Sequence, residues 1–360
     1  MTPELLSIAV SMGETMEGLD LRKGHYSRTF LGGGTFIGVN FSQADFRESD
    51  LREAVFDGCD LRGAMLTGAV LRRTVFNRCQ LDHATFQNAL LHACVISECE
   101  ATHSQFRSAR LSMATISQTK LDHASLQDAD LESAVLTGCS LLDVNADQVN
   151  WRHTSVLECD LTRLTWNHSK MVRTIFFKTS LQNLSFEGLN LEGCMFASAD
   201  LSGSNFSGVS MPQCNFQGAT LDGARFCHAQ APLAIFCEAK ATKGVDFTGA
   251  KLRQALFTAA QLPGALFGGA DLYQTHFAAA NIVGGDFRGA ELTYADFRHA
   301  QLDKADLRQA TMFRTCLHAT TTVEAQMTDR ARALETDPDL AESERWKPIA
   351  SCFALSASFE

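Results

Sequence analysis

Residues 295–307 read ADFRHAQLDKADL, which is one five-residue unit written repeatedly. Each unit has a small residue, a polar residue, a central Phe or Leu, and two mostly polar residues. Stepping by fives from Leu317, centres occur back to Phe247 and, after one extra residue, from Ala241 back to Leu21. Of these 60 centres, 46 are Leu or Phe, and 56 have Ala, Cys, Ser, Thr, Gly or Val two positions earlier. Such a fixed period indicates a repeat architecture.

A period of five restricts the fold. It matches neither the 3.6-residue period of an amphipathic helix nor the two-residue alternation of a strand. It does suit a square coil in which each side points one large and one small side chain inward, and stacked coils then bury a continuous core. The 60 centres predict 15 coils of 20 residues each. At an inter-strand spacing of about 4.8 Å, the rod would be about 70 Å long.

These units resemble the pentapeptide-repeat family, whose consensus is Ala, Asp or Asn, Leu or Phe, and two loosely specified residues. The stretch Ala44-Asp45-Phe46-Arg47 matches it almost literally. The resemblance covers roughly residues 19–319 and implies an all-β solenoid, a right-handed quadrilateral parallel β-helix. We therefore expect an N-terminal cap over 1–18, the β-helix over 19–319, and a C-terminal helical cap or dimerisation segment over 320–360. The extra residue within 242–245 predicts a bulge and a local kink, since Gly244 tolerates unusual backbone angles.

Both ends of the rod need a cover, because an open β-helix end exposes unpaired backbone and core side chains. Thr2 and Pro3 are typical of a helix start. We expect the following helix to cover the stack with its apolar residues Leu5, Leu6, Ile8, Ala9 and Met12; the alternative is a helix that docks a partner. At the other end we predict a helix over Thr321–Leu334 that ends at Asp337-Pro338, a short helix over Leu340–Trp346 and an apolar stretch over Ile349–Phe359. Known members of the family pair through C-terminal elements, so the resemblance also raises a homodimer through this segment.

The composition of the chain bears on which partners and which cellular compartment we expect. The net charge of −10 gives no reason to expect nucleic acid or an anionic membrane. The sequence has no apolar run near the ~20 residues of a membrane span, and no Sec signal at its N-terminus. We expect a cytoplasmic protein, exported, if at all, without a Sec signal.

Eight of the twelve cysteines occupy the small inward position of a unit. Free cysteine behaves as a small buried hydrophobe, so we interpret them as core residues and expect no metal or other cofactor; metal binding or redox chemistry is the alternative. The eight are Cys59, Cys79, Cys94, Cys99, Cys139, Cys159, Cys194 and Cys214.

One outward row of side chains is unusually apolar. On the side that contains Phe36, Phe56 and Phe76, the residue before the centre is large and apolar in eight of 15 coils. The other three sides have none, two and three such residues. High strand propensity would explain Val and Ile at exposed positions, but it should act on all sides. We therefore predict a binding or self-association surface, the apolar row, made of Val55, Val75, Val95, Val135, Ile175, Met195, Ile235 and Leu256.

Two further groups of outward residues are candidates. The repeat is degenerate over Leu141–Leu189, where Trp166 should be core and five cations suggest a contact site, or else a solvated irregular stretch: Arg152, Arg163, Lys170, Arg173 and Lys178. The second group is a row of three histidines in consecutive coils, His83, His103 and His123, with Asp82 and Asp122 beside the outer two. They are suited to bind a divalent ion or to respond to pH, or they form a solvated ladder without a role.

The sequence has no GxSxG, HExxH or P-loop motif, and a filled solenoid has no pocket, so we predict that the protein is not an enzyme. We expect a non-enzymatic scaffold that binds protein partners through the apolar row and its ends. Related rods in the family are bacterial effectors and accessory proteins, including ones that accompany type VI secretion spikes. The alternative that the resemblance offers is a DNA mimic that interacts with DNA gyrase and protects it from quinolones or toxins. Its acidic row would be Asp20, Asp60, Glu100, Asp160 and Asp200, interrupted by Arg22, Lys23, Arg62, Lys120 and Lys240.

Overall fold

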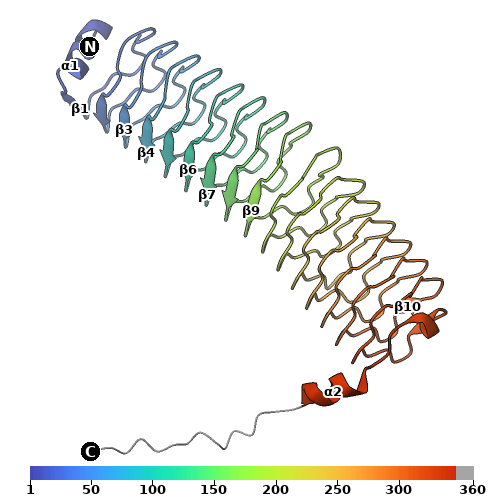
Figure 1. Cartoon of the computed structure of the whole chain (residues 1–360). Coiled ribbons are helices and arrows are strands. Elements are labelled where there is room, and N and C mark those ends of the chain that lie inside the picture. Colours follow the sequence, from blue (N-terminus) through green and yellow to red (C-terminus); the bar gives the residue numbers. More distant parts are fainter. Residues whose placement is uncertain (346–360) are drawn as a thin grey trace, which may run out of the picture.

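The computed structural model describes residues 1–345 and shows a curved rod of stacked turns, with helix α1 at one end and helix α2 beside the other (Figure 1). The chain makes about sixteen turns. Successive turns pair in parallel with residues 20 positions apart, as in the ladder Asp45↔Met65↔Thr85. The predicted β-solenoid with four five-residue sides per turn is therefore confirmed, and it has one more turn than the 60 centres indicated.

The helices and strands are short, because each side of a turn has room for only a few extended residues between two corners. They are α1 (Pro3–Ser11), β1 (Thr15–Glu17), β2 (Thr35–Ile37), β3 (Val55–Asp57), β4 (Val75–Asn77), β5 (Val95–Ser97), β6 (Thr115–Ser117), β7 (Val135–Thr137), β8 (Ser155–Leu157), β9 (Ile175–Phe177), β10 (Asp306–Leu307), β11 (Gln326–Met327), the 3-10 helix η1 (Arg330–Arg332) and α2 (Pro338–Arg345). Strands β1–β9 form one parallel sheet in sequence order. We call the side of the rod that contains them the strand side.

The five-residue unit forms a corner because one residue adopts a left-handed conformation. In the unit around Phe46, the second residue after the centre, Glu48, has φ of 58°. The amides of Phe46 and Glu48 donate to the carbonyls of Met65 and Thr67 in the next turn, at 2.8 and 3.0 Å. Each turn is thus bonded to the next by its own backbone, which makes the register of the side chains identical from turn to turn.

The core is the filling of this square tube. The 60 predicted centres are buried, and so are the small residues two positions before them, except Leu19, Gly24 and Thr29 in the first turn, which are half-buried. Aromatic centres stack between turns, as for Phe206 and Phe226, whose ring centroids lie 4.8 Å apart. Rings from opposite sides of the turn pack edge-on across the tube, as for Phe216 and Phe226 at 5.5 Å. Trp166, in the degenerate stretch, is also core as predicted, and its Nε1–H donates to the carbonyl of Ser185 at 2.7 Å.

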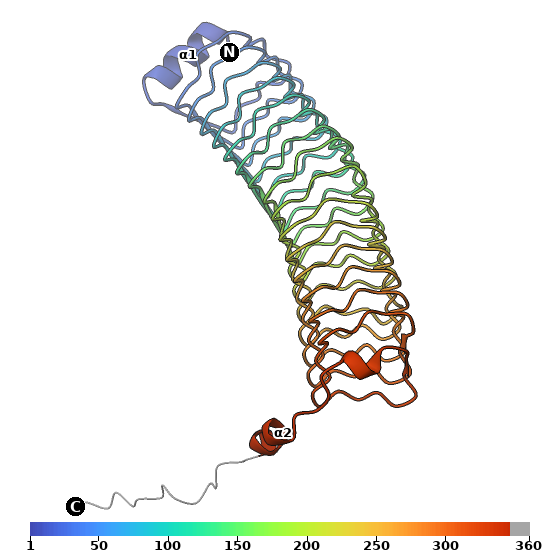
Figure 2. The same cartoon turned by 45° about the vertical axis from the view of Figure 1, so that its right-hand side comes forward.

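The extra residue lies at a corner, where it forms a bulge. Bridged residues are 21 positions apart at Arg225↔Asp246 and 20 apart again at Asp246↔Leu266. Gly244 has φ of 80°, in the range that favours glycine. The ladders continue past this point, so the bulge does not end a domain. Figure 2 shows that the rod curves over many turns, and the predicted kink at the bulge does not stand out.

Helix α1 covers the N-terminal end of the stack, but with only some of the predicted residues: Leu6 is buried and Ala9 packs against the core. Thr2 caps the helix through its hydroxyl, which accepts the N–H of Leu5 at 3.4 Å. Leu6 and Val10 face the core and are buried. Leu5, Ile8 and Met12 are exposed, so the prediction that these three cover the stack was wrong. Residues four apart share a helix face, and the pair Leu6 and Val10 defines the buried one.

The C-terminal end also differs from the prediction. The helix expected over Thr321–Leu334 was wrong, because these residues make a further turn: Gln301 bridges Thr321, β11 pairs with β10, and Cys316 bridges Leu334. Pro338 begins α2 instead of ending a helix, and the carboxylate of Asp337 accepts the N–H groups of Asp339 and Leu340. The short second helix is confirmed as far as Arg345. The predicted apolar stretch Ile349–Phe359 lies outside the described residues. Neither α1 nor α2 is long and apolar enough to cross a bilayer.

Candidate functional site

The apolar row lies on the outside of the strand side, as predicted. In each strand the middle residue points inward and its two neighbours point outward, because side chains alternate along a strand. The first members of the row are in register, with Val55 opposite Val75 and Val75 opposite Val95. All three are half-buried between their neighbours, while the central residues Phe56 and Phe76 are fully buried.

The row continues beyond the last strand of this sheet. A ladder of single bridges joins Ile175 to Met195, Met195 to Asn215, Asn215 to Ile235 and Ile235 to Leu256. All eight residues of the predicted apolar row therefore share one column on one side of the rod. Its apolar character ends near the C-terminus, where His276 and Asp296 occupy the same column.

The sequence reasoning missed a second set of apolar residues on this side. The position after each centre also points outward in a strand, and it is occupied by Leu157 in β8 and Phe177 in β9, which are directly opposite each other. With Ile175 and Met195 they form what we call the central apolar patch. Phe177 and Met195 are 38% and 39% exposed. The sequence signal for Leu157 and Phe177 is the residue after each centre, when these residues are grouped by side of the rod.

The five predicted basic residues do not form one patch. Arg152, Lys170 and Arg173 belong to the side of the rod that precedes the strand side in each turn. Arg163 lies at a different corner and pairs with Asp143 at 2.6 Å. Lys178 borders the central apolar patch, where its ammonium lies 5.3 Å from the ring centre of Phe177 and 3.4 Å from Glu158.

The histidine row forms a stack of parallel rings. The ring centres of His83 and His103 are 5.0 Å apart and those of His103 and His123 are 4.9 Å apart, with interplanar angles of 6° and 13°. Rings stacked in this way keep their nitrogens about one turn apart, whereas a zinc ion needs nitrogens within about 2.1 Å of itself. Asp82 and Asp122 accept backbone N–H groups of the following turn. This arrangement favours the interpretation that the three histidines form a solvated row without a functional role.

The predicted inward cysteines are buried, and several form a column on the side of the rod that follows the strand side in each turn. The thiols of Cys59, Cys79 and Cys99 donate to carbonyls 23 residues earlier, at 3.3, 3.3 and 3.5 Å. The column continues in later turns with Thr119, Cys139, Cys159 and Thr179, so both hydroxyl and thiol groups occupy it. Buried thiols that donate to backbone carbonyls suit core residues better than metal ligands. On the strand side itself, burial raises the pKa of the Cys94 thiol to about 12.

A second apolar surface lies on the outer face of α1. Met1, Leu5, Ile8 and Met12 follow the spacing of one helical face and are 56%, 57%, 55% and 73% exposed. This face is opposite to the one that covers the core. Exposed clusters of large apolar side chains on a protein surface are typical of interaction sites.

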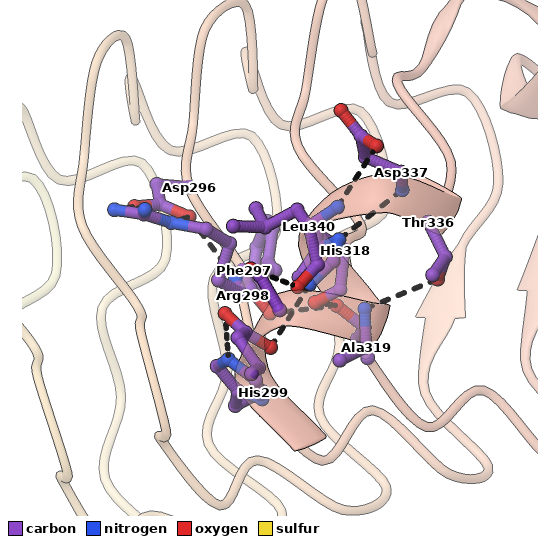
Figure 3. Close-up of polar contacts among 12 residues, drawn as sticks. Asp296, Phe297, Arg298, His299, His318, Ala319, Thr336, Asp337 and Leu340 are labelled. Atoms are coloured by element: carbon purple, nitrogen blue, oxygen red, sulfur yellow. Dashed lines mark hydrogen bonds and ion pairs between the residues drawn. The ribbon is translucent and has the colours of Figure 1, made fainter. Parts of the chain in front are cut away.

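At the C-terminal end, His318 holds both ends of α2 (Figure 3). Its side chain is 2% exposed. The backbone N–H of Asp337 donates to Nδ1 at 3.1 Å, and Nε2 lies 3.2 Å from a carboxylate oxygen of Glu344. The other oxygen of Glu344 lies 3.2 Å from Nε2 of His299. The hydrogen bond with His318 lowers the pKa of the Glu344 carboxyl below its ordinary value. We call His299, His318 and Glu344 the clasp.

The clasp has the residue types of a metal site, with ligand atoms within 4.8 Å of one another. Its hydrogen bonds, however, argue against metal binding. A histidine that binds metal through Nε2 carries its proton on Nδ1 and donates it to an acceptor. Here Nδ1 of His318 accepts the Asp337 N–H, so the hydrogen-bond network assigns the proton of neutral His318 to Nε2. The geometry therefore fits a contact that positions α2. Sequence reasoning missed the clasp, since its members come from two turns and a helix.

Comparison with known proteins agrees with this architecture. The family model described as pentapeptide repeat region matches residues 16–86 and 75–146, and the one described as pentapeptide repeats (8 copies) matches 174–213, 243–278 and 270–309. No curated protein matches the chain significantly. Similar solved structures include full-length QnrB1, a plasmid-mediated fluoroquinolone resistance protein (15% identity, 67% of this chain and 90% of that chain, TM-score 0.24). HetL, from the cyanobacterium Nostoc sp. strain PCC 7120, has 21% identity over 88% of this chain and 96% of its own, with a TM-score of 0.17. The family models together match more than half of the sequence, and the chain therefore belongs to the pentapeptide-repeat family.

Proposed function

We propose that this protein is a non-enzymatic rod that binds protein partners through its strand side and its ends. The observation that carries the proposal is the arrangement of the strand side, where the apolar row and the central apolar patch share one in-register surface. Its side chains are spaced by one inter-strand distance, about 4.8 Å. A contact made with one turn can therefore be repeated along the rod by an extended partner.

The central apolar patch is the expected centre of binding. Phe177 and Met195 are the most exposed of its four residues, and aromatic residues and Met are enriched in the cores of protein interfaces. Lys178 and Glu158 lie at its edge and supply a polar rim. The outer face of α1 offers a second apolar contact at the N-terminal end, and the C-terminal segment remains a candidate for self-association.

The interior supports a surface function and not catalysis. Stacked rings such as Phe216 and Phe236, 4.7 Å apart, fill the tube. Reactive groups would have to act on the outside of the rod, and buried catalytic chemistry generally needs a pocket. The inward thiols donate to backbone carbonyls and are not poised as nucleophiles.

DNA mimicry has weaker support from the acidic row. The carboxylate of Asp20 is paired with Arg22 at 2.6 Å, and that of Asp60 with Arg62 at 2.7 Å, each from the same unit. These pairs neutralise two of the five charges that the mimic would present. A DNA gyrase supercoiling assay with purified protein tests this alternative, and it fails if micromolar protein neither protects nor inhibits the enzyme.

The experiment that tests the proposal is a comparison of two surface variants. Phe177→Glu with Met195→Glu places two charges in the central apolar patch, and Thr165→Glu with Ser185→Glu places two charges at exposed positions on the opposite side of the rod. We expect the first variant to lose the proteins that copurify with the rod from its native cell, while the control retains them. Identification of those proteins would test whether the partner is a secretion component, as the family resemblance suggests. Equal recovery with both variants would contradict the proposal.

A further inference from the structure

A cleft lies between α2 and the C-terminal end of the strand side. It has a volume of about 570 Å³, and its lining includes Cys316, His318, Leu334 and Leu340. Two of these residues are large, apolar and exposed: Leu334 to 51% and Leu340 to 39%. The polar members of the lining are already engaged, since Asp296 pairs with Arg298 at 2.7 Å and His318 contacts both ends of α2. Among residues 1–345, the part of the cleft that no other side chain covers is therefore its apolar surface.

The clasp fixes the C-terminal end of α2 close to this cleft. Glu344 is held against His299 and His318, so the end of α2 at Arg345 has a defined position. Leu340 precedes Arg345 by five residues, which is about 8 Å along a helix. The chain therefore leaves α2 within a few residues' reach of the exposed leucines.

The composition of the next fifteen residues matches this surface. Residues 346–360 contain five large apolar side chains, Trp346, Ile349, Phe353, Leu355 and Phe359, and only two charged ones, Lys347 and Glu360. Fully extended, such a segment spans at most about 50 Å, far more than is needed to cross the neighbouring cleft. Because it is tethered beside the cleft, its effective concentration there is on the order of millimolar.

We propose that residues 346–360 of the same chain dock in this cleft and cover Leu334 and Leu340. The hydrophobic effect favours this, since the most apolar end segment of the chain begins beside an uncovered apolar cleft. A second copy of the chain is the competing occupant, and it would have to overcome the local concentration of the tethered segment. The inference concerns the C-terminal end of the strand side and is independent of whether the apolar row binds partners.

Trp346 provides a direct test in the full-length protein. The other two tryptophans, Trp151 and Trp166, are buried in the core, so iodide quenching of fluorescence reports on Trp346. Burial of one large apolar side chain shifts an equilibrium by about tenfold or more, so we expect iodide to quench Trp346 about tenfold less efficiently than free tryptophan amide. The protection should not depend on protein concentration.

Variants identify the cleft as the cause of that protection. Leu334→Asp should restore rapid quenching, and since Leu334 is half exposed the substitution leaves the fold intact. Val323→Asp is the matched control, because Val323 lies in the same last turn, is 66% exposed and does not line the cleft. Quenching of the unmodified protein at the rate of free tryptophan would overturn the proposal. So would equal effects of the two variants, or protection that appears only at high protein concentration, which would indicate a second copy.

Discussion

Replacement of His318 by alanine is expected to release α2 from the rod without unfolding the solenoid. The substitution removes two hydrogen bonds, the one that Nδ1 accepts from the Asp337 N–H and the one between Nε2 and Glu344, and each contributes about 1 kcal/mol. For a total of about 2 kcal/mol, the docking equilibrium of α2 shifts roughly 30-fold. His299→Ala is the control, since it removes only a half-exposed contact with Glu344.

Hydrogen exchange of the Ala341 amide measures this release. That amide donates to the carbonyl of Asp337 at 3.0 Å inside α2. A helix of eight residues is unstable on its own in water, so undocking should expose the amide. We expect exchange to be roughly 30-fold faster in His318→Ala, nearly unchanged in His299→Ala, and unchanged at Phe287 in the solenoid. Unchanged exchange in His318→Ala, or equal acceleration in both variants, would refute the role assigned to His318.

Three further predictions concern the core, the cysteine column and pH. Phe226→Ala, which removes a fully buried ring stacked between Phe206 and Phe247, should lower the free energy of unfolding by about 3–5 kcal/mol in urea titrations. Cys79→Ser should leave stability nearly unchanged because a hydroxyl can also donate to the Phe56 carbonyl, whereas Cys79→Val loses that bond and should cost about 1 kcal/mol. The pKa of Glu344 is lowered in the folded protein, so its contribution to α2 docking is complete above about pH 4.5 and is lost as the pH falls through the folded-state pKa. Exchange at Ala341 should therefore become relatively faster in acid, and Glu344→Gln should abolish that pH dependence.

The fold could be predicted from the sequence because every unit repeats the same inward pair. The centres and small residues are identifiable one by one, and each turn serves as the template for the next. The last turn escaped prediction because Thr322 and Met327 occupy the centre positions, and the segment is rich in helix-forming residues. Its strand β11 forms because the exposed edge of β10 is available for pairing. Local propensity was overridden there by a tertiary contact.

The candidate sites were predictable to different degrees. The column from Val55 to Leu256 follows from the period alone, since residues 20 apart share a side. Leu157 and Phe177 follow from the same period, at the outward position after each centre instead of the one before it. The clasp depends on how α2 returns to the rod, and no periodicity connects His318 with Glu344. The phase of α1 was also not fixed by composition, because apolar residues occupy both of its faces.

Binding of proteins to the strand side can be tested by measuring the affinity of a copurified partner for two triple variants. Val55→Lys, Val75→Lys and Val95→Lys place three charges in the apolar row. Met65→Lys, Thr85→Lys and Gln105→Lys place three charges on the opposite side of the same turns. We predict that the first variant binds its partner at least about tenfold more weakly with an unchanged fold, while the second binds like the unmodified protein. Equal affinity of both variants for the partner would show that the strand side is not the binding surface.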